Sequence, residues 1–98
     1  MRLPPDYVAA IKEAAREAFG EGAVVRLFGS RVRDDRRGGD IDLHFEVDPG
    51  RGTDAELDRF EDKLFQRIEP QRVDKVFSVR GEPLGPFEQI AYRDGVVL

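Results

Sequence analysis

The sequence predicts an α/β (α+β) fold in which helices cover a small mixed sheet of at least three strands. Apolar residues recur at helical spacing in some segments, and stretches rich in β-branched residues lie between those segments. The predicted order is helix, strand, short helix or loop, strand, helix, strand and helix, an alternation typical of such sheets. The 98 residues suit one unit, so we expect a single domain over residues 1–98.

The first helix is expected to begin at Pro4-Pro5, because a proline is tolerated in a first helical turn, and to end at Gly20 and Gly22. Its apolar face follows three- and four-residue steps and consists of Val8, Ile11, Ala15, Ala18 and Phe19. Residues 23–28 are rich in β-branched side chains and predict a mostly buried strand that leads into Gly29 and Ser30.

Residues 31–39, RVRDDRRGG, are expected to form a short irregular helical turn and a loop. Residues 40–47 alternate strictly between polar and apolar, which predicts a strand with one buried face. Thr53 and Glu56 match a capping box for a second helix, which Pro70 ends. The expected core stripe of that helix is Leu57, Phe60, Leu64 and Ile68.

Residues 72–79 predict a third strand, because valine and phenylalanine alternate there with polar residues. Phe87, Ile90 and Ala91 indicate a short last helix that ends near Gly95. Residues 96–98 are expected to pack back onto the body of the domain.

The composition excludes several kinds of site. Without cysteine there is no disulfide, no thiolate zinc site and no Cys nucleophile, and the Walker A, G-x-G-x-x-G, H-E-x-x-H and G-x-S-x-G patterns are absent. Eleven Asp, nine Glu and thirteen Arg suit divalent metal and phosphate chemistry, whereas a net charge of −4 argues against duplex DNA as a partner. No apolar run reaches the ~18 residues of a membrane span, and no secretory signal opens the chain, so we expect a cytoplasmic protein.

Three aspartates form the candidate catalytic and metal-binding group. Asp40 and Asp42 lie two residues apart in a predicted strand, so they share one face, and Asp74 can join them if the third strand is a neighbour. Carboxylates that close repel one another unless a cation neutralises them, and oxygen ligands favour Mg²⁺ or Mn²⁺. The alternative, a solvated strand face, is the commoner explanation for Asp42, Glu46 or Asp74 taken singly.

Gly29 and Ser30 strengthen the case for a site. A strand that ends in glycine lets a backbone approach phosphate closely, and the serine hydroxyl can donate to phosphate oxygens. Arg31 follows directly and is expected to bind phosphate, whereas Arg33, Arg36 and Arg37 stay open between phosphate contact and a solvated loop.

Other polar residues of the predicted strands are given ordinary roles. We expect His44 at the surface or rim, with a metal or proton-transfer role as the less favoured alternative, and Glu46 in solvent. Ser78 shares a face with Asp74, so it could line the site.

The motifs at residues 27–31 (LFGSR), 39–43 (GDIDL) and 73–76 (VDKV), with the ending GVVL, resemble the nucleotidyltransferase superfamily. They are most similar to its minimal members, the antitoxin halves of HEPN/minimal nucleotidyltransferase toxin–antitoxin pairs. The resemblance covers nearly the whole chain and implies a nucleotidyltransferase-like fold. It also implies transfer of a nucleoside monophosphate, here expected to be AMP from ATP, to an acceptor hydroxyl.

The resemblance also implies roles for individual residues. Asp40 and Asp42 would hold the metal ion that grips the triphosphate, and Asp74 would complete a second metal site and help deprotonate the acceptor. Gly29 and Ser30 would hold the β- and γ-phosphates. The implied acceptor is a tyrosine on a HEPN-type toxin, so we expect a hetero-oligomer with that partner.

Two other functions stay open. One is an inactive antitoxin that neutralises its partner by contact alone, although an inactive site has no reason to keep three clustered acids. The other is a transferase that acts on RNA ends, which the net charge of −4 disfavours and the arginine-rich loop favours. Tyr7 and Tyr92 are expected to pack or to contact a partner rather than to accept the nucleotide themselves.

Overall fold

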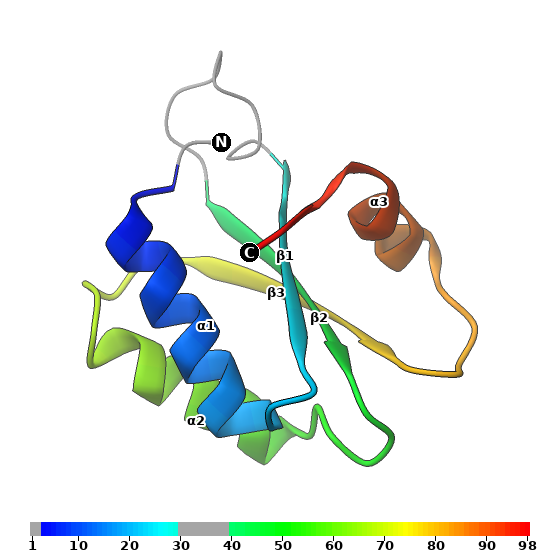
Figure 1. The fold of residues 1–98 in the computed structure, drawn as a ribbon, viewed down its shortest axis with the longest axis horizontal. Helices are drawn as coiled ribbons and strands as arrows, with labels where there is room; N and C mark the ends of the chain where they lie inside the picture. Colours follow the sequence, from blue (N-terminus) through cyan, green and yellow to red (C-terminus); the bar gives the residue numbers. More distant parts are fainter. Residues whose placement is uncertain (1–2, 30–39) are drawn as a thin grey trace.

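A computed structural model describes residues 3–29 and 40–98, and the turn predicted for residues 31–39 lies outside them. The described chain is a mixed α+β domain, as predicted (Figure 1). Its elements, in chain order, are α1 (Pro5–Phe19), β1 (Val24–Phe28), β2 (Ile41–Val47), α2 (Asp54–Phe65), β3 (Val73–Val79), α3 (Pro86–Asp94) and β4 (Val96–Val97). None of the described helices is long and apolar enough to cross a membrane.

The sheet contains four strands in the order β3-β2-β1-β4. β1 is antiparallel to both β2 and β4, whereas β2 is parallel to β3. A parallel pair needs a long crossover, and α2 supplies it. As a result, the end of β1 and the beginnings of β2 and β3 meet at one edge of the sheet.

The two faces of the sheet are covered differently. α1 and α2 lie together on one face, and α3 lies on the other (Figure 1). The hydrophobic core fills the space under α1 and α2, where the Phe45 ring lies 5.0 Å from Phe19 and 4.8 Å from Phe60, centroid to centroid. The apolar residues of β2 that point into this core are Ile41, Leu43, Phe45 and Val47.

β1 is less buried than its composition predicted. Only Val25 and Leu27 are buried, and the residues between and beside them are half-buried. The expectation of a mostly buried strand is therefore wrong, because the face that carries Arg26 is turned to α3 and its polar partners rather than to the core.

α2 begins as predicted and ends earlier than predicted. The Thr53 side chain accepts a 3.2 Å hydrogen bond from the Glu56 amide, whereas the Glu56 carboxylate accepts from the Gly52 amide at 2.6 Å, one residue before the position that a capping box uses. The helix ends at Phe65 rather than near Pro70. The amide of Ile68 still donates to the Leu64 carbonyl at 3.0 Å, so the apolar spacing continues past the end of the helix.

α3 occupies the predicted place but exposes most of its apolar side chains. Ala91 is buried, whereas Phe87 is 69% exposed and Ile90 is 40% exposed. Residues 96–97 pair with β1, which confirms that the end of the chain packs back onto the body. The exposed large apolar side chains of α3, the preceding loop and β4 are Leu84, Phe87, Ile90, Val96 and Val97.

Candidate active site

Two of the three predicted carboxylates are direct neighbours across the sheet. Asp42 of β2 is in register with Asp74 of β3 in the parallel pair, and with Phe28 of β1 in the antiparallel pair. Paired residues of adjacent strands point to the same face, and neighbouring strands lie about 4.8 Å apart. Asp40 immediately precedes β2 at the same edge of the sheet. The neighbourhood expected from the alternation of residues 40–47 therefore exists.

Gly29 follows the last residue of β1 and lies against the Asp42 side chain at this edge of the sheet. Its φ of +77° lies in the left-handed region, which favours glycine. A Cβ at this position would lie 2.2 Å from Oδ2 of Asp42, so a larger residue would collide with the carboxylate. Gly29 thus lets the backbone touch Asp42 at the end of β1. Ser30 and Arg31, the other two predicted phosphate contacts, lie outside the described residues.

The carboxylates of Asp40, Asp42 and Asp74 lie close enough to repel one another, and burial and this repulsion together change the pKa of Asp42. Burial raises the pKa of Asp42, and the neighbouring carboxylates of Asp74 and Asp40 raise it further. Arg72 acts in the opposite direction on the pKa of Asp42. The Nε atom of Arg72 lies 3.3 Å from Oδ2 of Asp40 and 3.4 Å from Oδ1 of Asp74. One guanidinium therefore contacts both outer carboxylates.

The donors at this edge fit a hard divalent cation that shares its coordination with a substrate. The described residues contain no group of three or more His, Cys, Asp or Glu side chains arranged to hold a metal ion on their own. Mg²⁺, however, is usually bound by one or two carboxylates together with substrate phosphates. Asp42 and Asp74 offer such a pair, and the rise in the pKa of Asp42 marks a place where added positive charge is favourable.

Comparison with protein families identifies the kind of domain that this chain forms. The family model described as a nucleotidyltransferase domain matches residues 8–94, from within the first turn of α1 to the end of α3. The chain belongs to the nucleotidyltransferase domain family. A search of curated proteins finds no match. Membership supports nucleotidyl transfer as the activity and agrees with the mixed α+β fold.

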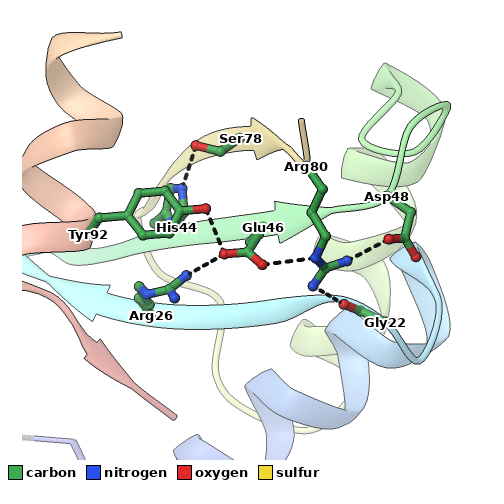
Figure 2. Close-up of polar contacts among 8 residues, drawn as sticks. All are labelled: Gly22, Arg26, His44, Glu46, Asp48, Ser78, Arg80 and Tyr92. Carbon is green, nitrogen blue, oxygen red and sulfur yellow. Dashed lines mark hydrogen bonds and ion pairs between the residues drawn. The ribbon is translucent and has the colours of Figure 1, made fainter. Parts of the chain in front are cut away.

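Beside the carboxylates, the nucleotidyltransferase domain carries a network of polar side chains between the sheet and α3 (Figure 2). Glu46 is its centre: its Oε1 accepts from the Tyr92 hydroxyl at 2.6 Å and from Arg26 at 3.2 Å, and its Oε2 accepts from Arg80 at 2.9 Å. Arg80 also pairs with Asp48 at 2.6 Å. The expectation that Glu46 is solvated is therefore wrong, because residues from three other parts of the chain surround it.

His44 and Ser78 form a second, fully buried contact in the same layer. Nε2 of His44 and Oγ of Ser78 share a hydrogen bond of 2.7 Å, and the Tyr92 ring lies 4.8 Å from the imidazole, centroid to centroid (Figure 2). His44 is buried rather than at the rim, so that expectation is also wrong. Burial, followed by the nearby Arg26 charge, lowers the pKa of His44, which favours the neutral ring.

Arg72 contacts two aspartates of the candidate site and was not predicted from the sequence. It precedes Asp74 by two positions, next to the beginning of β3. The same rule of alternation that grouped Asp40 with Asp42 places Arg72 and Asp74 on one side of an extended chain. Charge complementarity between this arginine and the clustered aspartates was the available signal.

Proposed function

We propose that this nucleotidyltransferase domain transfers AMP from ATP to a hydroxyl group of a partner protein. The proposed acceptor is a tyrosine of a HEPN-type toxin, and the chain would act as the antitoxin of that pair. The observation that carries the proposal is the register of Asp42 with Asp74 beside Gly29, in a chain that belongs to the nucleotidyltransferase domain family.

In the proposed reaction, the acceptor oxygen attacks the α-phosphorus of ATP. The bond from that phosphorus to the bridging oxygen breaks, pyrophosphate leaves, and the acceptor proton passes to a carboxylate oxygen of Asp74. Asp74 suits this role because its side chain is 44% exposed and therefore open to an incoming hydroxyl. The backbone of Gly29, followed in the sequence by Ser30 and Arg31, would hold the outer phosphates.

Asp40, Asp42 and Asp74 are the residues that would hold Mg²⁺ or Mn²⁺. When bound, such ions stabilise the charge that develops on the attacking and leaving oxygens of an in-line displacement. The residues themselves supply closely spaced, negatively charged oxygen donors at one edge of the sheet. They also give that edge its selectivity for hard cations over soft ones.

The exposed apolar side chains support a protein as the acceptor. Phe87 and Ile90 of α3 and Leu84 before it are exposed, and α3 lies on the same side of the sheet as Glu46, Arg26 and the carboxylates. Exposed apolar side chains that gather on one element often mark a protein-binding surface. A partner bound there would bring its acceptor residue close to the edge that carries Asp42.

The proposal is tested by label transfer. Purified protein is incubated with α-labelled ATP and Mg²⁺ in lysate from its own organism, beside the Asp42→Asn variant. Asp58→Asn is the matched control, because it makes the same change at an exposed position of α2 on the opposite side of the sheet. We expect wild type and Asp58→Asn to label a protein band, and Asp42→Asn to label it roughly 100-fold less or not at all.

Other outcomes would select the alternatives. Label on RNA with wild type alone would replace the protein acceptor by RNA ends. Absence of label together with tight binding of Mg·ATP would also contradict the proposal as stated. Absence of both label and Mg·ATP binding would favour an antitoxin that acts by contact alone.

A further inference from the structure

The ion pairs of Arg72 are unusual for so exposed a side chain. Its side chain is 73% exposed, yet a single nitrogen lies within 3.4 Å of carboxylate oxygens from two different segments, Asp40 before β2 and Asp74 within β3. Arg93 provides the comparison: its side chain is 72% exposed, and it pairs with its immediate chain neighbour, Asp94. Arg72 instead joins residues 34 positions apart in the sequence, and both are candidate metal ligands.

The guanidinium thus supplies positive charge among acids that repel one another. A divalent cation at the same edge would bind the same carboxylates. It would compete with Arg72 for their oxygens, so binding of either one weakens binding of the other. Phosphate oxygens, by contrast, are good acceptors for a guanidinium, which can bind them in a bidentate manner.

We propose that Arg72 is a positioning residue that competes with the divalent cation for Asp40 and Asp74 until a nucleoside triphosphate accepts its guanidinium. The inference rests on the proposed function, since it concerns the same site. It predicts that the cation and the triphosphate bind cooperatively. Each of them favours the arrangement in which Arg72 has left Asp40 and Asp74 and contacts the phosphates. The cation alone binds weakly, and the triphosphate releases the carboxylates for it.

The test measures binding of Mn²⁺ from the electron paramagnetic resonance signal of the free ion, with and without a non-hydrolysable ATP analogue. A protein-free sample with the analogue gives the Mn²⁺ that the analogue itself chelates, which is subtracted. Wild type is compared with Arg72→Gln, with Arg72→Lys, and with Arg93→Gln as the matched control. We expect Arg72→Gln to bind Mn²⁺ alone about three- to fivefold more tightly than wild type, an increase that lies within what two exposed ion pairs allow. Arg93→Gln should match wild type, and Arg72→Lys should lie closer to wild type than Arg72→Gln does.

Two further readouts separate competition from a general structural effect. The ATP analogue should strengthen Mn²⁺ binding more in wild type than in Arg72→Gln. The advantage of Arg72→Gln should also shrink as the NaCl concentration rises, because salt screens exposed ion pairs. Equal or weaker Mn²⁺ affinity in Arg72→Gln would overturn the inference, since Arg72 would then support the carboxylates or be neutral toward them.

Failure of this inference and failure of the proposed function give different results. If wild type binds Mn²⁺ with the ATP analogue and Arg72→Gln does not differ from it, only the role of Arg72 is wrong. If neither protein binds Mn²⁺ under any of these conditions, both proposals are wrong. Circular dichroism of each variant checks that the fold is retained.

Discussion

Glu46 shows how the properties of one residue in this protein depend on partners that are distant in the sequence. Its carboxylate is contacted by Tyr92 of α3, Arg26 of β1 and Arg80 after β3. The hydrogen bond from Tyr92 is the largest cause that lowers the pKa of Glu46, and the two arginines lower it further. The Tyr92 hydroxyl stays protonated as the donor, because burial and Glu46 raise the pKa of that phenol.

This network predicts that the stability of the fold depends on pH, and that the hydrogen bond from Tyr92 to Glu46 is a main cause of this dependence. A carboxylate whose pKa is lower in the folded protein than in the unfolded chain stabilises the fold at pH values above its ordinary value of 4.5, and that contribution is lost as the pH falls through the lowered pKa. Tyr92→Phe should therefore reduce the free energy of unfolding by about 1.5 kcal/mol at pH 7, and by less in acid. Urea unfolding at neutral and acidic pH measures both values.

Tyr7→Phe is the control for this experiment, because the Tyr7 hydroxyl has a long 3.5 Å contact with the Gln71 amide rather than one with a carboxylate. An equal loss of stability at both pH values in Tyr92→Phe would contradict the assigned role of the hydrogen bond.

At the same scale, the sequence predicted Asp40, Asp42 and Asp74 but not the surroundings of Glu46 and His44. The aspartates could be found because alternation within a strand is a local rule, and each lies at or beside a strand start. The positions of Glu46 and His44 depend on α3, which follows them by about 40 residues and covers their face of the sheet. No local pattern in residues 40–47 contains that information.

Among the elements, α2 is the one whose boundaries are best explained by individual contacts. Thr53 caps its first turn, and Arg67, two residues after its end, donates to the Lys63 carbonyl of its last turn and pairs with Glu17 of α1 at 2.6 Å. α2 is also the crossover that makes β2 and β3 parallel, so the beginnings of both strands, which carry Asp42 and Asp74, lie at the same edge of the sheet. The helix periodicity and the cap were predictable from the sequence, whereas the adjacency of β2 and β3 was not.

Removal of the cap is expected to destabilise the fold without altering the site directly. Thr53→Ala should lower the free energy of unfolding by about 1 kcal/mol, because the Glu56 amide loses its acceptor. Thr53→Ser retains the hydroxyl and should stay within a few tenths of the wild-type value. Chemical denaturation followed by circular dichroism compares the three proteins, and equal stability of Thr53→Ala and wild type would show that the cap contributes nothing.

α3 is the element for which the helix could be predicted from the sequence but its buried face could not. Its helical spacing was recognised, but Phe87 and Ile90 are exposed, whereas the helix packs on the sheet through Ala91 and Tyr92. Spacing identifies a helix and its apolar side chains. It does not show which of them face the sheet when the helix is short and the surface beneath it is polar.

For the molecule as a whole, the important feature is the separation of the core from the candidate active site. The apolar residues of β2 face α1 and α2, and its polar residues face the other side. The carboxylates can therefore meet a ligand without disturbing the hydrophobic core. A ligand that binds only the folded state raises its stability.

Mg·ATP should accordingly raise the melting temperature. At ten times its dissociation constant the gain is about 1.4 kcal/mol, which corresponds to roughly 5–10 °C for a domain of this size. Differential scanning calorimetry measures the shift, with Mg²⁺ and AMP as the control without a triphosphate. Asp42→Asn should show a much smaller shift than wild type, and equal shifts in the two proteins would place the nucleotide elsewhere.

The separation of the two faces also has a consequence for mixtures of active and inactive copies. Asp42 contributes nothing to the core, and the exposed apolar surface of α3 does not include it, so an Asp42→Asn copy would keep both its fold and its proposed partner surface. Such a copy would occupy partner molecules without modifying them. When both forms are produced in one cell, the inactive form should therefore reduce modification of the partner. This reduction should grow with the inactive form's share of the total.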